Sequence, residues 1–150
     1  MFRRLILVSV LSVFALPAFA AELIRKDSPH SVVDTMDRLE LAVRGAGATV
    51  FARVNHAAGA QKVDMDLPAA EVLIFGNPKL GTPAMQADIT AGLDLPMRVL
   101  VHETASGGTQ IVYRAPNALS EDHAVPAETK VLKMMTGALD KLTAKAASQD

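Results

Sequence analysis

Two stretches of the chain carry apolar residues at the spacing of an amphipathic helix. Charged residues occupy the positions between them, which predicts two helices that each pack one face against a core. We expect the first helix to begin at Ser28-Pro29, since serine caps a helix N-terminus and proline fits its first turn, and to end at Gly45 and Gly47. The last helix is expected to begin at Pro126. The apolar positions are Val32, Met36, Leu39 and Val43 in the first stretch and Val131, Met135, Leu139, Leu142 and Ala146 in the second.

Five other segments are rich in β-branched and aromatic residues and are bounded by turn residues, which predicts strands. The third is almost continuously apolar, so we expect it to lie centrally in a sheet or to be covered on both faces. A glycine-containing turn joins the last two and predicts a hairpin. Short helices are predicted at 55–63 and, after Thr82-Pro83, at 84–87. The strands are expected at residues 22–26, 49–54, 71–75, 97–103 and 109–114.

The predicted order is therefore β-α-β-β-β-β-α, with small helical inserts. Two amphipathic helices on one face of an antiparallel-rich sheet bury both apolar surfaces, so the fold class is α+β and the architecture a two-layer α/β sandwich. A length of 150 residues favours one domain, which we place at residues 21–147, with 148–150 as a frayed tail. The chain has no cysteine, so its stability must come from packing.

The first 20 residues have the organisation of a bacterial signal peptide. Arg3 and Arg4 precede an apolar run at 5–16, Pro17 interrupts it, and Ala18-Phe19-Ala20 is a small-x-small cleavage site. We therefore expect a periplasmic or secreted protein without a membrane anchor after cleavage. Removing the two arginines leaves 13 basic residues (15 − 2) against 16 acidic ones, a formal charge of −3. Such a surface does not attract nucleic acid.

One loop between a strand and a helix carries unusual chemistry. It has the sequence FGNPKLGTPAMQ at residues 75–86, and its two glycines and two prolines predict a rigid, shaped segment. A helix that starts at Thr82 would offer free amide groups to an anion, with Lys79 nearby. The loop is not a nucleotide-binding P-loop, because it lacks the lysine between the second glycine and the threonine.

Several segments of the chain resemble the family called domain of unknown function 302. They are Ile74 to Gln86, Ala91 to Val101, Ser28 to Val32 and Phe51 to Ala58. The resemblance implies a compact two-layer α/β sandwich and homodimers, and it brings no reaction, substrate or cofactor. The family pattern around Tyr113 often continues to an aspartate; here Arg114-Ala115-Pro116 follows, so no role for an acid is carried over.

The remaining candidate chemistry is sparse. None of the four histidines has the spacing of a zinc motif, and no G-x-S-x-G elbow or cysteine nucleophile occurs. Asp94 lies just before Leu95-Pro96 and is expected to anchor the loop by accepting backbone amides.

We therefore expect a non-catalytic module that binds a small molecule or a periplasmic protein, without a cofactor or metal and without a catalytic residue. Two alternatives are an enzyme with a composite His/Asp/Tyr site, and a carrier of copper or another metal that uses thioether and imidazole ligands. The binding residues are expected to be Asn77, Lys79, Thr82, Met85 and Gln86, with His56, His102 and Tyr113 as walls. Gly76, Pro78, Gly81, Pro83, Asp94 and Pro96 are expected to shape the loop.

Overall fold

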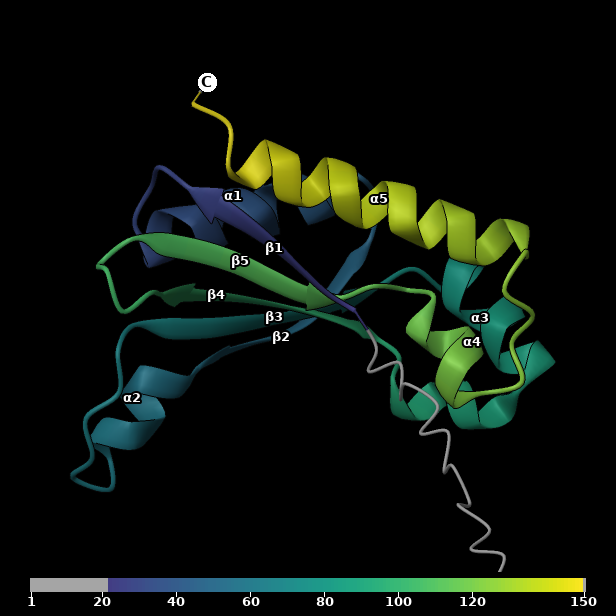
Figure 1. Cartoon of the computed structure of the whole chain (residues 1–150), viewed down its shortest axis with the longest axis horizontal. Coiled ribbons are helices and arrows are strands. Elements are labelled where there is room, and N and C mark those ends of the chain that lie inside the picture. Colours follow the sequence, from purple (N-terminus) through teal and green to yellow (C-terminus); the bar gives the residue numbers. More distant parts are fainter. Residues whose placement is uncertain (1–21, 150) are drawn as a thin grey trace, which may run out of the picture.

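The computed structural model describes residues 22–149, so the predicted signal peptide lies outside the described residues. A five-stranded sheet in the order β1-β5-β4-β3-β2 forms one layer, and every neighbouring pair of strands is antiparallel (Figure 1). The predicted α+β fold and element order are confirmed. The strands are β1 (Leu23–Ser28), β2 (Thr49–Asn55), β3 (Ala70–Gly76), β4 (Met97–Glu103) and β5 (Thr109–Arg114).

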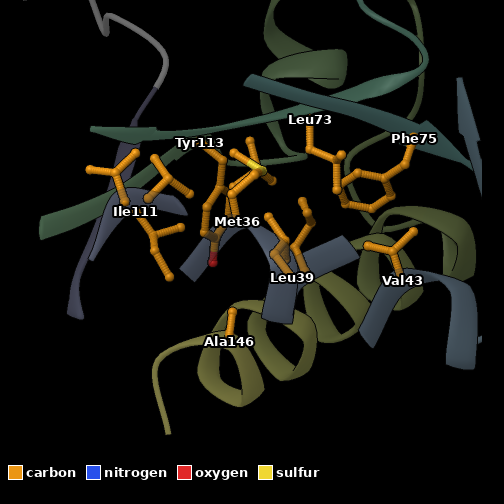
Figure 2. Close-up of a cluster of buried hydrophobic side chains, with 12 residues drawn as sticks. Met36, Leu39, Val43, Leu73, Phe75, Ile111, Tyr113 and Ala146 are labelled. Atoms are coloured by element: carbon orange, nitrogen blue, oxygen red, sulfur yellow. The ribbon is translucent and has the colours of Figure 1, made fainter. Parts of the chain in front are cut away.

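Two long helices, α1 (Val32–Gly45) and α5 (Lys130–Ala146), form the second layer on one face of the sheet (Figure 1). Their predicted apolar stripes face the core: Met36 and Leu39 are fully buried, and Leu139 is 2% exposed. Figure 2 shows how α1 places Met36, Leu39 and Val43 against side chains of the sheet. Because alternate strand residues point to the same face, β3, β4 and β5 contribute every second residue to this core. The sheet contributes Leu73, Phe75, Val99, Val101, Ile111 and Tyr113.

Both long helices begin later than the prolines predicted. Ser28 is the last residue of β1, where it pairs with Thr109, so the strand continues through the expected cap. Ser31 caps α1 instead, and its hydroxyl accepts the Asp34 amide at 3.1 Å. Thr129 caps α5 in the same way, three residues after Pro126. In both helices, the hydroxyl residue directly before the apolar stripe marks the helix start more accurately than the preceding proline does.

The helix in the conspicuous loop also differs from the prediction. α3 (Pro78–Ala87) begins at Pro78, and Thr82-Pro83 lies inside it. Proline at the first helical position needs no N–H partner, and the Asn77 side chain caps the end by accepting the Lys79 amide at 2.9 Å. The loop is thus mostly helix. The predicted short helix after β2 is confirmed as α2 (His56–Gln61), whereas η1 (Ile89–Leu93) and α4 (Ala118–Asp122) were not predicted.

The second face of the sheet carries neither long helix, and we call it the open face (Figure 1). β3 alternates between half-buried and buried residues, so it is not covered on both faces as its apolar sequence suggested. Its central place is confirmed, because it pairs with β2 on one side and β4 on the other.

Candidate functional site

The start of α3 borders a cavity of about 330 Å³ at the end of the sheet. β3 ends and β4 begins on one side of this pocket, and α5 closes the other. Phe75 and Gly76 come from the strand end, Leu80 from α3, and Met135 and Leu139 from α5. The complete lining is Ala46, Ala48, Phe51, Phe75, Gly76, Asn77, Pro78, Leu80, Gly81, Thr82, Met85, Leu95, Pro96, Met97, Met135, Ala138, Leu139 and Leu142.

The lining is apolar and contains no charged residue. Its polar side chains are those of Asn77 and Thr82. The side-chain oxygen of Asn77 accepts a hydrogen bond from the Lys79 amide. The side-chain NH₂ group of Asn77 is therefore the part that can donate to a ligand. Apolar walls with few polar groups are typical of small-molecule sites.

The structure brings together part of the predicted binding set. Asn77, Thr82 and Met85 line the pocket, together with the predicted loop-shaping residues Gly76 and Pro96. Pro78 and Gly81 also belong to the lining, and Pro96 follows a cis peptide bond. Lys79 and Gln86 are exposed and do not belong to the lining, and Pro83 lies within α3.

The expected anion site loses its basis because the helix does not start at Thr82. At the true start, the amides of Lys79, Leu80 and Gly81 all donate to Asn77, at 2.9 Å in each case. These amides are therefore satisfied within the protein and are not available to a ligand.

The three residues expected as further walls lie elsewhere. His102 pairs across the sheet with Ala70, and His56 follows the end of β2 next to the same position, so both lie at the end of the sheet opposite the pocket. Tyr113 is 6% exposed and belongs to the main core (Figure 2). The His56, His102 and Asp94 side chains that the enzyme hypothesis needs do not converge.

Asp94 instead holds a polar cluster beside the pocket. Its carboxylate accepts from His123 Nε2 at 2.8 Å and lies 3.3 Å from Arg98 and 3.5 Å from Arg114. We predicted that Asp94 anchors the loop by accepting hydrogen bonds from backbone amides. Its partners are instead the side chains of His123, Arg98 and Arg114. The cluster ties the segment before β4, which carries the pocket residue Leu95, to β5 and to the chain after α4.

A hydroxyl, an imidazole and a carboxylate lie next to one another in space in this cluster, as they do in a hydrolase triad. Thr90 Oγ1 is 3.0 Å from His123 Nδ1, and His123 in turn binds Asp94. The Thr90 hydroxyl, however, donates its proton to Asp88 at 2.7 Å. The ionised Asp88 carboxylate can only accept, so it competes with His123 Nδ1 for the single proton of the Thr90 hydroxyl. We interpret the cluster as a structural clasp.

Asp88 completes the clasp from the adjacent residue. Hydrogen bonds from the amide of Ala124 and from the hydroxyl and amide of Thr90 lower its pKa to about 2. These bonds join η1 to the chain that leads into α5. No part of residues 22–149 gathers three or more His, Cys, Asp or Glu side chains that could hold a metal ion.

The thioethers of the copper hypothesis are distributed among the pocket, the core and the surface, where Met65 and Met134 are exposed. Met85, Met97 and Met135 line the pocket, whereas Met36 is fully buried under α1. The end of Met85 packs against Gly92, where an added Cβ would lie 2.9 Å from the Met85 methyl group. Sequence reasoning missed most of the apolar lining. The α5 stripe was recognised as core, but nothing in its spacing showed that one half borders a cavity.

Residues 24–142, most of the chain, match the family described as "Domain of unknown function DUF302". The chain belongs to this DUF302 family. It is also 38% identical over 117 residues to "Fluoride-specific ion channel FluC 1" of Brucella suis biovar 1 (strain 1330), a match that covers 77% of this chain and 46% of that protein. "Fluoride-specific ion channel FluC 2" of Brucella melitensis biotype 1 is 38% identical over the same length, with 43% of that protein covered. The DUF302 chain thus spans less than half the length of these relatives.

A solved structure shares the fold. The DUF302 protein of Bacillus stearothermophilus, described as an uncharacterized conserved protein, superposes with a TM-score of 0.66 at 20% identity, covering 83% of this chain and 94% of that one. Within residues 22–149, none of the helices combines the length and the apolar character needed to span a bilayer.

Proposed function

We propose that this DUF302 protein is exported and binds a small, neutral, largely apolar molecule in the pocket between α3 and α5. The observation that carries the proposal is a concave cavity whose lining has no charged side chain. A charged ligand buried there would lose its hydration without gaining an ion pair, which disfavours it strongly.

The size of the cavity limits the ligand. Its 330 Å³ is at the small end of ligand pockets and is about twice the volume of an engineered cavity of ~150 Å³ that binds benzene. If each non-hydrogen atom takes about 30 Å³, the volume of one liquid water, the pocket holds about eleven such atoms. One fused aromatic pair or a medium-length acyl chain fits this limit.

The polar groups at the start of α3 would determine which way round a ligand binds in the pocket. The Asn77 NH₂ group can donate to a carbonyl or ether oxygen of the ligand, while its own oxygen caps the helix. The Thr82 hydroxyl offers a second partner. We therefore expect a ligand with an apolar body and one hydrogen-bond acceptor at the α3 end.

The test uses the neutral fluorophore 2-naphthol, a fused aromatic pair whose size fits this limit, and two matched substitutions on α5. Ala138 lines the pocket, whereas Ala144 is exposed on the same helix. Ala138→Phe fills the cavity and should weaken fluorophore binding at least tenfold, and Ala144→Phe should bind as the wild type does. Circular dichroism establishes that both variants are folded.

A second variant tests the orientation. Thr82→Val keeps the shape of the side chain and removes the hydroxyl, so it should weaken binding of 2-naphthol more than binding of naphthalene. Equal fluorophore binding by Ala138→Phe and Ala144→Phe, or no saturable binding by the wild type, would overturn the proposed function.

A further inference from the structure

One aromatic side chain in the wall of the pocket is largely exposed to solvent. Among the described residues, the rings of Phe75 and Tyr113 are only 4% and 6% exposed. Phe51, by contrast, is 58% exposed, although it belongs to the lining of the pocket. A ring that is exposed to this extent gains little from the core of its own chain, so most of its apolar surface is available to a molecule that covers it.

The exposed ring is placed by an irregularity of strand β2. Val50 pairs with Phe75 and Ala52 pairs with Ile74, so Phe51 is an extra residue without a partner in the ladder. Such a β-bulge bends the strand and changes the direction of a side chain, and bulges are frequent beside active sites for this reason. The bulge therefore gives a specific reason why Phe51 lies at the pocket.

The ring of Phe51 lies beside the end of β3, near Pro96. A Cβ atom added to Gly76 would lie 3.6 Å from Cε2 of Phe51 and 3.4 Å from Cβ of Pro96. Because Gly76 has no side chain, both rings can approach the backbone of β3 at this point. Phe51, Gly76 and Pro96 all belong to the pocket lining, so the exposed ring forms part of the rim.

Other residues of the lining are suited to an aromatic partner. They include a second phenylalanine, Phe75, and the thioethers of Met85, Met97 and Met135. Aromatic pairs in offset or edge-to-face contact gain energy beyond the area that they bury, and sulfur atoms make favourable contacts with ring edges. A saturated chain in the same space would gain from its buried area alone.

We propose that the pocket binds a planar aromatic molecule and that Phe51 stacks against this molecule at the rim. The inference rests on the proposed function, and it selects the fused aromatic pair over the acyl chain of similar size. Asn77 and Thr82 belong to the same lining, so the ring system should carry a hydroxyl or carbonyl oxygen that pairs with them. The chemical class is therefore a neutral phenol or aromatic ketone.

Calorimetric titration with two matched alcohols tests the role of Phe51. 2-Naphthol and decahydro-2-naphthol share one carbon skeleton and one hydroxyl group, and only the first is aromatic. An aromatic contact strengthens binding by about two- to tenfold. Phe51→Leu should therefore raise the dissociation constant of 2-naphthol by at least about threefold and that of decahydro-2-naphthol by less than about twofold. Phe51→Tyr keeps the ring and should bind both alcohols as the wild type does.

Leu41 supplies the control for the loss of an exposed apolar side chain. It is 71% exposed on α1 and does not belong to the pocket lining. Phe51→Ala should weaken binding of 2-naphthol, whereas Leu41→Ala should not. Circular dichroism establishes that each variant is folded.

The outcomes separate this inference from the proposed function. If the wild type binds both alcohols and Phe51→Leu leaves the ratio of their dissociation constants unchanged, the pocket binds ligands but the stacking role of Phe51 is overturned. Equal loss of 2-naphthol binding in Phe51→Tyr and Phe51→Leu would overturn that role as well. If the wild type binds neither alcohol saturably, the proposed function and this inference are both overturned.

Discussion

Glu71 is a buried carboxylate whose removal gives a sharp test of how α1 is held on the sheet. It is 5% exposed and faces the helix layer from β3. One oxygen accepts Arg53 Nε at 2.5 Å, and the other accepts the Asn55 side-chain amide at 3.1 Å. Arg53 also binds Asp37 of α1, so the cluster joins the helix to two strands. Burial alone would lower the pKa of Arg53, but the hydrogen bonds to Glu71 and Asp37 outweigh it and raise the pKa above its usual value.

The cost of Glu71→Ala follows from these contacts. Removing one partner of a fully buried ion pair costs about 3–5 kcal/mol, because the other charge is left uncompensated. Arg53 is 27% exposed and keeps Asp37, so water and the remaining carboxylate reduce this cost to about 2–3 kcal/mol. For a domain of this size, each kcal/mol lowers the Tm by roughly 3–5 °C, so we expect a decrease of about 10 °C.

Urea unfolding and calorimetry measure the effect, with Glu103→Ala at the exposed end of β4 as the control. The control should change the free energy of unfolding by less than about 0.5 kcal/mol. The double variant Glu71→Leu/Arg53→Met, which replaces the pair by apolar side chains, should lose less than Glu71→Ala does. If Glu71→Ala is as stable as Glu103→Ala, the ion pair does not hold the layers together and the reasoning is refuted.

Two further predictions concern the clasp and the core. Because hydrogen bonds from the Ala124 amide and a neighbouring hydroxyl lower the pKa of Asp88 from 3.8 to about 2, its stabilising effect is complete above pH 3.8 and disappears as the pH falls toward 2. Asp88→Asn should therefore flatten the acid limb of the stability curve measured by urea unfolding, and an unchanged limb, or the same flattening in the exposed Asp66→Asn, would contradict the clasp. On α1, Leu39 is fully buried and Leu41 is 71% exposed. Leu39→Ala should cost about 2–5 kcal/mol of unfolding free energy and Leu41→Ala less than about 0.5, and equal losses would mean that the face of α1 is misassigned.

The sequence alone determined the elements and their order, because periodicity is a local property. The spacing of Val32, Met36, Leu39 and Val43 specifies one face of a helix whatever surrounds it, and all four are buried. The final hairpin, 97–103 and 109–114, was predicted with the boundaries that β4 and β5 have. The predicted starts of α1 and α3 were wrong, because a residue that can cap a helix can also lie elsewhere. Ser28 pairs in strand β1, and Thr82 lies inside α3.

Only the tertiary structure decided where side chains meet. Asn77 and Met135 are far apart in the sequence, and they share a pocket because the ends of β3, α3 and α5 converge at one end of the sheet. His123 meets Asp94 for the same reason, and no spacing in the sequence announces that contact. Local patterns record which face of an element is apolar. A cavity arises where several such faces fail to fill the space between them, and that depends on the packing of the whole chain.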